Sequence, residues 1–559
     1  MGMDDMQEFT PDVVVVGAGL AGLVATYELT KAGRRVLVLD QENRHNLGGQ
    51  AFWSLGGLFL VDSPEQRRTG IRDSLDLAVQ DWAGSAAFDR LSDEDLWGAR
   101  WAEAYVRLAH RGKRDYLQGV GVRLVPVVGW AERGDGSATG HGNSVPRFHL
   151  TWGAGPGIVE AFATPVLAAE KRGLVRFAFR HRVDELLTEG GAVVGVQGEV
   201  LVEDDAARGV ASSREVVRRF THRAPAVVVT SGGIGHDREA MRRSWPTERV
   251  GPAPTHLIAG VPAHVDGRML AIAERAGGRL VNRDRMWAYT EGIHGWDPIW
   301  PDHGIRILPG PSSMWFDATG RRLTGMSGVP GADSLGAMTQ ILATGHDYSW
   351  FVLTQTIIER EFALSGSEQN PDITGRDLRL LLRTRLSSGA PGPIEAFKRN
   401  GIDFVVADDL DSLVDGMNRL SRGPHLEVAG LDRQIQARDR EITNPFSKDV
   451  QVMAIHNARR AWTERRVRVA APHRILDPAH GPLIAVRLNI LSRKTLGGLQ
   501  TDLDSRVLDA EGRPIPGLYA AGEVAGFGGG GVHGYNALEG TFLGGCLFSG
   551  RAAGRTLAR

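Results

Sequence analysis

Three glycines and an acidic residue near the start of the chain have the types and spacing that could hold the phosphates and a ribose of a dinucleotide. The glycines are Gly17, Gly19 and Gly22, and the acid is Asp40. In such a turn the first glycine permits the tight bend, the second lets a pyrophosphate approach the backbone, and the third lets a helix pack close to a strand. The carboxylate of Asp40 is placed to accept hydrogen bonds from an adenosine ribose. These residues predict dinucleotide binding.

The elements that must position these residues are visible on either side of them. Val13–Val16 is a continuous β-branched run, which is typical of a buried parallel strand. An Ala/Leu-rich helical stretch follows and extends to Lys31, and Val36–Leu39 forms a second apolar strand that ends at Asp40. Free N–H groups and the dipole at the start of the helix would hold the phosphates. Gly-x-Gly-x-x-Gly alone is a weak signal, but this full context makes the prediction specific.

Three further segments favour FAD over NAD. Residues 48–57 carry paired glycines at both ends, so the backbone there could pass close to a large planar group. The strand expected over 226–230 runs into the glycine-rich turn 231–233, where a second loop could approach the cofactor. Residues 521–523 precede a glycine run and a helix, and the carboxylate of Glu523 could bind ribityl hydroxyls.

The pattern of residues along the chain changes twice, which indicates a discontinuous domain with an insertion. Strand-like, glycine-rich segments occupy 1–250 and 477–559, whereas helical periodicity dominates 251–476. We therefore expect an α/β fold in which a Rossmann-like FAD-binding domain, made of the first and last ranges, is interrupted by an α+β cap domain. A length of 559 residues also exceeds what one ordinary core can hold. The expected cap helices cover 354–364, 374–385 and 449–466.

These segments resemble motifs of FAD-dependent oxidoreductase family 2, which contains the flavoprotein subunits of fumarate reductase and succinate dehydrogenase and the 3-ketosteroid 1-dehydrogenases. The family pattern GGNTxxAxGG is similar to residues 48–57, and ATGG resembles 230–233. The pattern LYAAGEVxGGVHGxNxLxG resembles 518–540. The resemblance is strong at both ends of the chain and weak over the cap.

The resemblance implies a role for each matching residue. The first three glycines would face the pyrophosphate, and Val183 would offer its backbone to the adenine. Phe542 and Leu543 would present N–H groups to the pyrimidine edge of the flavin at an expected helix start, where partial positive charge stabilises the anionic reduced ring. The full set of expected FAD contacts is Gly17, Ala18, Gly19, Ala21, Gly22, Asp40, Gln41, Gly48, Gly49, Gln50, Ala51, Ser54, Gly56, Gly57, Val183, Thr230, Ser231, Gly232, Gly522, Glu523, Phe542 and Leu543.

The mode of attachment also follows from the resemblance. Membrane succinate dehydrogenases hold FAD covalently through a histidine, and the matching position here is Gln50. His45 lies nearby in a different register. We therefore expect FAD to be bound non-covalently.

Three positions that handle substrate carboxylates in the fumarate-reducing members differ in this chain. The family segment HHTMGG corresponds to 493–498, which begins with Arg493 and Lys494. The arginine of NRLGG is replaced by Ala537, and RGxG becomes Pro-Gly-Pro-Ser at 309–312. Small dicarboxylates are therefore disfavoured, although Arg493 could still bind one carboxylate.

Steroid dehydrogenation needs a different set of groups. A tyrosine base removes a proton next to a carbonyl, an oxyanion contact holds the enolate, and hydride leaves the neighbouring carbon for the flavin. In that family a tyrosine stands four residues before the glycine that matches Gly540. This position is Asn536 here, and Tyr535 is one residue away, which on a helix turns a side chain by about 100°. Gly540 itself could supply an oxyanion N–H.

The expected catalytic residues are accordingly Tyr535, His533, Arg493 and Gly540, with Lys494 beside them. Each side chain also has a structural interpretation: the histidine could brace the flavin loop, the tyrosine could be a core residue, and the two cations could be solvated. Glu539 is either a general base or a salt-bridge partner of Arg493. The aromatic and histidine side chains of the cap could contact a flat apolar substrate or form its core; they are Tyr289, His294, Trp296, Trp300, His303, Trp315 and Tyr348.

Three functions remain open at this point. The leading hypothesis is an FAD-dependent dehydrogenase or reductase that acts on a carbonyl-activated C–C bond, in a steroid-like or other bulky apolar compound. The alternatives are a fumarate-reductase-like enzyme for a small unsaturated acid, and an FAD-carrying binding protein without catalysis. A small-molecule substrate and an electron acceptor of unknown identity are the expected partners.

Composition limits the possible partners, cofactors and location of the protein. A formal net charge of -1 gives no general attraction to nucleic acid, and no uncharged apolar run reaches the roughly 18 residues of a membrane span. The lone cysteine, Cys546, and an acidic N-terminus without signal-peptide character favour the cytoplasm. No metal-ligand spacing and no CxxCH heme attachment are present.

Overall fold

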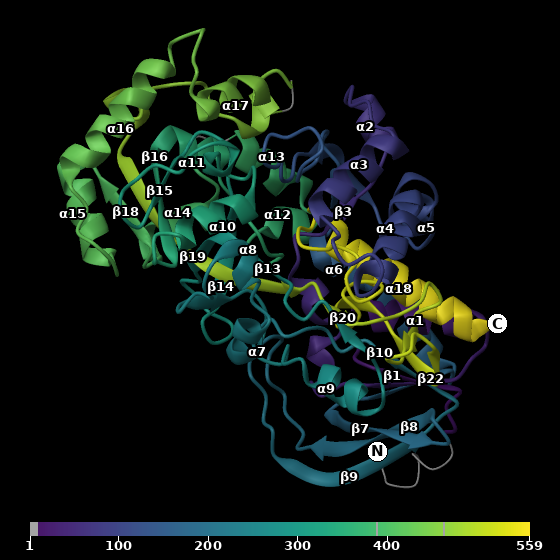
Figure 1. Cartoon of the computed structure of the whole chain (residues 1–559). Coiled ribbons are helices and arrows are strands. Elements are labelled where there is room, and N and C mark those ends of the chain that lie inside the picture. The colour runs from purple at the N-terminus through teal and green to yellow at the C-terminus, as the bar shows by residue number, and fades with distance from the viewer. Residues whose placement is uncertain (1–8, 387–388, 462–463) are drawn as a thin grey trace.

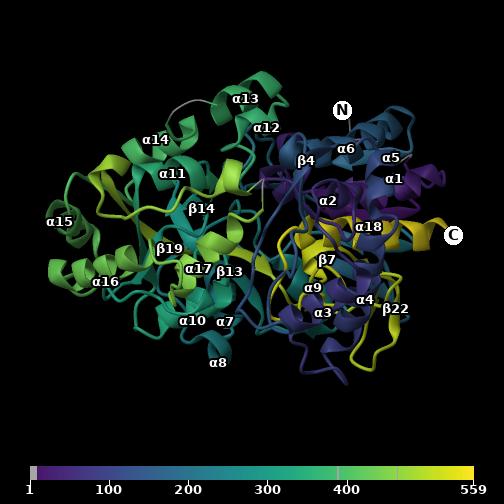
Figure 2. The same cartoon turned by 90° about the horizontal axis from the view of Figure 1, so that it is seen from above.

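The computed structural model describes residues 9–386, 389–461 and 464–559. Two large sheets organise these residues into two lobes that lie side by side (Figures 1 and 2). One sheet has six strands in the order β21-β22-β10-β1-β2-β6, and the other has eight. The α/β fold with a Rossmann-like domain and an inserted cap is thereby confirmed.

The six-stranded sheet is the centre of the Rossmann-like domain. Strand β1 pairs in parallel with β2 and β10, and only β21 is antiparallel among the described strands of this sheet. Val13 and Val15 face the helices α1, α6 and α18, whereas Val14 and Val16 face the three-stranded sheet β7-β8-β9. Because both faces are covered, the strand is apolar at every position. The strands are β1 (Val13–Val16), β2 (Val36–Leu39), β6 (Val175–Ala178), β10 (Ala226–Val229), β21 (Arg506–Leu508) and β22 (Pro514–Ala520).

The C-terminal segment completes this domain after the cap. Strand β22 joins the sheet beside β10, and the last helix packs against α1. The first and last parts of the chain therefore share one core, as the texture predicted. The covering elements are α1 (Leu20–Lys31), α6 (Ala154–Lys171), β7 (His181–Glu189), β8 (Ala192–Leu201), β9 (Val216–Arg223) and α18 (Thr541–Ala558).

The cap is built on the eight-stranded sheet, whose long central strand is β19. Strand β19 pairs with β11, β13, β16 and β18, and helices pack on the sheet to enclose a core of its own. The strands are β11 (Leu257–Ala259), β13 (Met286–His294), β14 (Gly304–Leu308), β15 (Met314–Asp317), β16 (Tyr348–Thr354), β17 (Ala363–Leu364), β18 (Phe404–Ala407) and β19 (Leu483–Thr495). The helices are α10 (Ser334–Leu342), α11 (Gln355–Glu361), α12 (Pro371–Thr374), α13 (Leu378–Leu386), α14 (Gly392–Asn400), α15 (Leu410–Leu420), α16 (Val428–Glu441) and α17 (Val450–Ala458).

The position of β19 differs from the boundary drawn from the sequence. The boundary at 476/477 gave residues 483–495 to the Rossmann-like domain, but the structure makes them the central strand of the cap sheet. Strand β19 is buried over almost its whole length, so it has the same apolar texture as a strand of the parallel sheet. The apolar character of a strand alone does not say which sheet the strand joins. In Figure 1 it runs from the cap toward the other lobe.

The expected cap helices exist with shorter limits. Helix α11 begins at Gln355 and ends at Glu361, before the short strand β17, and α13 and α17 occupy the other two predicted ranges. Of the range 449–466, residues 462–463 lie outside the described part of the chain, as do residues 1–8 of the N-terminus.

The remaining elements surround the sheets. No helix within the described ranges is long and apolar enough to cross a membrane. The other elements are η2 (Arg44–Asn46), η3 (Gly49–Trp53), β3 (Gly57–Phe59), α2 (Pro64–Arg68), α3 (Leu75–Ala86), α4 (Asp95–His110), α5 (Lys113–Gly119), β4 (Leu124–Gly129), β5 (Phe148–Thr151), α7 (Arg238–Arg243), α8 (Thr247–Val250), α9 (Arg268–Arg275), β12 (Leu280–Val281), η4 (Met326–Gly328), η5 (Glu464–Arg468), η6 (Pro478–His480), β20 (Gly498–Leu499) and η7 (Gly522–Val524).

Close packing at Gly22 gives a test of the fold. A Cβ atom at this position would lie 2.1 Å from the carbonyl oxygen of Gly17, so Gly22→Ala must push α1 away from β1. We expect a cost of about 1–3 kcal/mol and a lower midpoint of thermal unfolding. The matched control is Gly119→Ala, because a Cβ atom at Gly119 meets nothing within 4 Å. An unchanged midpoint of thermal unfolding for Gly22→Ala would contradict the close packing of α1 against β1.

Candidate functional site

A cavity of about 790 Å³ lies between the ends of the parallel strands and the cap. Ligands of open α/β sheets bind at this edge. The cavity gathers loops that are far apart in the sequence and reaches into the cap. The predicted site residues that line it are Gly17, Gly19, Ala21, Asp40, Gln41, Gly48, Gly49, Gln50, Ala51, Ser54, Gly56, Gly57, Val183, Thr230, Ser231, Gly232, Arg493, Gly522, Glu523, Gly540, Phe542 and Leu543.

Ala18 and Gly22 belong to the same turn but do not line the cavity. The backbone N–H of Ala18 donates to the Asp40 carboxylate at 2.8 Å, so it fixes the acid at the end of β2. The N–H of Glu42 donates to the other oxygen of that carboxylate at 2.9 Å. Burial outweighs these two hydrogen bonds and raises the pKa of Asp40 to about 6. The turn and the acid are thus one preformed unit.

The glycines at 48–57 serve packing as well as ligand access. Gly56 has a φ of +82°, and a Cβ atom there would lie 2.6 Å from the backbone of Ala154 at the start of α6. The loop 48–57 is therefore held between α6 and the turn at Gly19, which forms a bridge with Gly48. Held in this way, the backbone of the loop forms one wall of the cavity.

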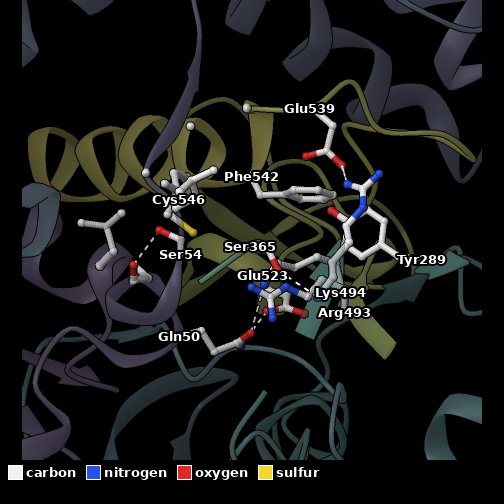
Figure 3. A pocket seen from close by; sticks show the side chains of 18 of the residues that line it. Gln50, Ser54, Tyr289, Ser365, Arg493, Lys494, Glu523, Glu539, Phe542 and Cys546 are labelled. Atoms are coloured by element: carbon white, nitrogen blue, oxygen red, sulfur yellow. Dashed lines mark hydrogen bonds and ion pairs between the residues drawn. The ribbon is translucent and has the colours of Figure 1, made fainter. Parts of the chain in front are cut away.

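A polar network joins three segments at the centre of the cavity (Figure 3). The Gln50 amide donates to Glu523 at 2.8 Å and accepts from Nζ of Lys494 at 3.1 Å. The second oxygen of Glu523 accepts from the backbone N–H of Thr495 at 2.9 Å. Burial lowers the pKa of Lys494 to about 8, and the Glu523 charge opposes that shift. The network ties η3, η7 and the end of β19 together.

A second group of charges surrounds Arg306, a buried residue of β14. Its guanidinium lies 2.6 Å from Glu539 and 3.4 Å from both Glu132 and Glu291. It also lies 3.7 Å above the ring of Tyr289. Burial raises the pKa of Glu291, while the Arg306 charge opposes that shift.

Tyr289 brings a phenol to the cavity next to these charges. Figure 3 shows it on the same side as Glu539 and Phe542. Burial and the Glu539 charge raise the pKa of Tyr289, while Arg306 lowers it. The phenol therefore stays protonated at neutral pH and can donate a hydrogen bond to a ligand oxygen.

Two of the expected catalytic residues do not line the cavity. The Tyr535 hydroxyl donates to Asp89 at 3.1 Å, and its ring is covered by Arg249 and Arg285 at 3.3 and 3.8 Å. His533 is 1% exposed and stacks on Trp82, and burial lowers its pKa to about 3. Assigning these two side chains to the reacting face is therefore corrected.

The one-residue offset at Tyr535 explains part of this correction. The chain there follows the turn from 526 to 540 rather than a helix, and Tyr535 points back toward the loop after α3, where its N–H donates to Ala86. His533 packs edge-on against Phe542, at 5.0 Å between ring centres. It braces the start of α18, which is the structural interpretation of this residue.

The pairing of Glu539 also differs from one expectation. Its partner is Arg306, whereas the guanidinium of Arg493 donates to the carbonyl of Gly260. Sequence reasoning did not single out Arg306 or Glu132. A signal for the arginine exists in the sequence, because it interrupts the apolar run Gly-Ile-Arg-Ile-Leu of a strand.

Most aromatic residues of the cap form its core. Trp315 and Tyr348 are each 1% exposed within the cap core, and Trp300 packs on His303 with ring centres 3.7 Å apart. Of the seven residues named as cap aromatics and histidines, Tyr289 alone lines the cavity. Of that set, only Tyr289 supports the flat-substrate interpretation; the other apolar and aromatic side chains of the cavity lie outside it.

The residues present fit FAD. The cavity runs from the turn at Gly17 to the start of α18, where Gly540 caps the helix without a side-chain hydrogen bond. The first N–H groups of that helix are thus available to a ligand beside Phe542 and Leu543. Two carboxylates, Asp40 and Glu523, lie along the same cavity as expected for the ribose and the ribityl chain.

Comparison with known proteins decides the family. The family described as FAD binding domain matches residues 12–543. The chain belongs to this family. It is an FAD-dependent oxidoreductase, as the resemblance of its two ends implied.

The relatives extend along the whole chain. A KsdD-like steroid dehydrogenase of Mycobacterium tuberculosis is 60% identical over 554 residues, which cover 99% of this chain and 97% of that protein. The solved 3-ketosteroid delta1-dehydrogenase of Sterolibacterium denitrificans has a TM-score of 0.67 at 17% identity, with 98% and 99% of the two chains covered. A flavocytochrome c3 fumarate reductase has a TM-score of 0.63 at 19% identity, with 100% and 81% covered. The two solved structures show a shared fold.

The surroundings of Gln50 bear on how FAD is attached. Gln50, which the family resemblance matches to the attaching histidine, hydrogen-bonds to Lys494 and Glu523. His45 is exposed, does not line the cavity, and contacts the carbonyl of Ala206. We therefore expect acid or heat denaturation to release all the flavin into the supernatant. Yellow colour or fluorescence that stays with the precipitated protein would contradict non-covalent binding.

Proposed function

We propose that this protein removes hydrogen from a C–C bond next to a ketone in a steroid-like molecule, with FAD as the oxidant. The observation that carries the proposal is the pairing, in one cavity, of the FAD-binding loops with the phenol of Tyr289 and the carboxylate of Glu539. Close relatives that bear the name steroid dehydrogenase support it.

The chemistry needs a donor for the ketone and a base for the neighbouring proton. The protonated phenol of Tyr289 would donate to the carbonyl oxygen, and the N–H of Gly540 is a second candidate donor. The carboxylate of Glu539, oriented by Arg306, would take the proton from the α-carbon. Bound FAD supplies the acceptor for the hydride from the β-carbon.

The cap side of the cavity suits a flat apolar ligand. Apolar side chains from β4 and the residue after it, from β14, from the loop after η4 and from α13 line the cavity there. They are Val125, Val127, Trp130, Leu308, Val329, Leu381 and Leu382.

A small dicarboxylate fits this wall poorly. Arg306 already faces three carboxylates, so its positive charge is compensated within the protein. Arg493 donates to the carbonyl of Gly260 and Lys494 donates to the amide of Gln50, so both of these cations also have partners within the protein. This charge arrangement favours the ketone substrate over the fumarate-like alternative.

Anaerobic titration tests the substrate class directly. FAD-loaded protein is mixed with a 3-ketosteroid that is saturated next to its ketone, and we expect the yellow absorbance to bleach in proportion to the steroid added. Fumarate added to the dithionite-reduced protein should leave it reduced. Reoxidation by fumarate together with no bleaching by steroids would reject the proposal.

Two tyrosine variants distinguish between the two candidate catalytic phenols. Tyr289→Phe removes the proposed donor, and we expect flavin reduction in a stopped-flow experiment to slow by about 10²–10³-fold. Tyr535→Phe removes a hydroxyl that contacts Asp89 away from the cavity, so its rate should stay within a few-fold of the original. The reverse pattern would restore Tyr535 as the catalytic residue.

A further inference from the structure

A half-buried lysine at the end of β19, Lys494, has no role in the proton and hydride steps above. Lys494 lines the cavity and reaches Gln50, and it is held within the protein by the close packing of β19 against β13. Burying a cation without a purpose is costly, because the charged form loses its hydration. Its ammonium group donates to the neutral amide of Gln50 at 3.1 Å.

The neighbours of Lys494 locate it relative to the flavin. Gln50 belongs to η3, Glu523 to η7, and Cys546 lies on α18 one helical turn after Phe542. Glu523 is the residue expected to hold the ribityl chain, and Gln50 matches the histidine that attaches FAD in related enzymes. A lysine that reaches Gln50 in the same cavity would therefore lie close to the flavin ring.

We propose that Lys494 raises the reduction potential of bound FAD and so biases the protein toward oxidising its substrate. A fixed cation stabilises the reduced, anionic ring more than the neutral oxidised ring. Reduction by two electrons and one proton then becomes more favourable, while the lysine itself keeps its proton. The effect is electrostatic, and it does not depend on which substrate delivers the hydride.

Other charges face Lys494 and set the size of the effect. Glu523 and Glu539 are the nearby acids, Arg493 is the nearby cation, and burial holds the thiol of Cys546 protonated by raising its pKa to about 12. Glu523 is shared with the N–H of Thr495 and the Gln50 amide, so its charge is partly balanced without the lysine. Replacement of the charged Lys494 by a neutral residue therefore makes the net charge beside the ring more negative by one unit.

The test is the midpoint potential of the FAD-loaded protein, measured by equilibration with a reference dye. Lys494→Met keeps the length of the side chain and removes its charge. We expect the affinity for reduced FAD to fall at least ten-fold relative to oxidised FAD, which corresponds to a potential lower by about 30 mV for two electrons. Lys494→Arg keeps the charge and should retain most of the original potential.

The pH dependence gives a second readout within the unmodified protein. Burial lowers the pKa of Lys494 to about 8, so the group loses its proton as the pH rises from 7 to 10. A group with a lowered pKa is charged below that value and neutral above it. The difference in midpoint potential between the original protein and Lys494→Met should therefore become smaller toward pH 10.

The matched control is Lys398→Met, in which a cap lysine paired with Glu395 is replaced away from the cavity. Its potential should equal that of the original protein. A Lys494→Met potential equal to the original, or a Lys494→Arg potential as low as that of Lys494→Met, would overturn the inference. The measurement uses no steroid, so failure of the proposed substrate would leave this result unaffected.

Discussion

The hydrogen bond from the N–H of Thr495 to Glu523 joins the two lobes at the cavity that would hold FAD. Thr495 is the last residue of β19, the central strand of the cap sheet, and Glu523 follows β22 of the parallel sheet. A buried carboxylate that accepts this bond and the Gln50 amide fixes the separation of cap and cofactor loops. The substrate wall is positioned from that one junction, because β13 and β14 continue the same sheet.

Two groups of charged residues lie in different parts of the cavity, and this junction keeps them apart. Lys494 and Glu523 lie beside the expected ribityl chain, whereas Arg306 and its three carboxylates lie beside Tyr289. Glu523 of the first group and Arg306 of the second are buried, so their charges act more strongly than they would at a surface. The first group acts on the cofactor, and the second orients the groups that meet the substrate.

The nucleotide end of the site could be predicted from the sequence, because its determinants are local. The turn at Gly17, the acid at Asp40 and the strand before them lie within one βαβ unit, where spacing fixes geometry. The reacting end could not, since Tyr289, Arg306 and Glu539 come from distant strands and a turn. Tyr535 shows the limit most clearly: a motif offset by one residue turned its side chain to Asp89. The domain boundary was misplaced for a related reason, because a strand buried on both faces has the same texture in either sheet.

The fold alone does not choose between oxidation and reduction of the substrate. This chain superimposes about equally well on a ketosteroid dehydrogenase and on a fumarate reductase. The placement of charge in this chain adds the argument that the fold lacks: Arg306 is compensated by carboxylates, while Lys494 is half-buried in the cavity expected to hold the cofactor. Compensation of Arg306 favours a neutral ketone as the substrate, and a cation near the ring favours the reduced cofactor. Both arrangements act in the same direction, toward taking hydrogen from an apolar molecule.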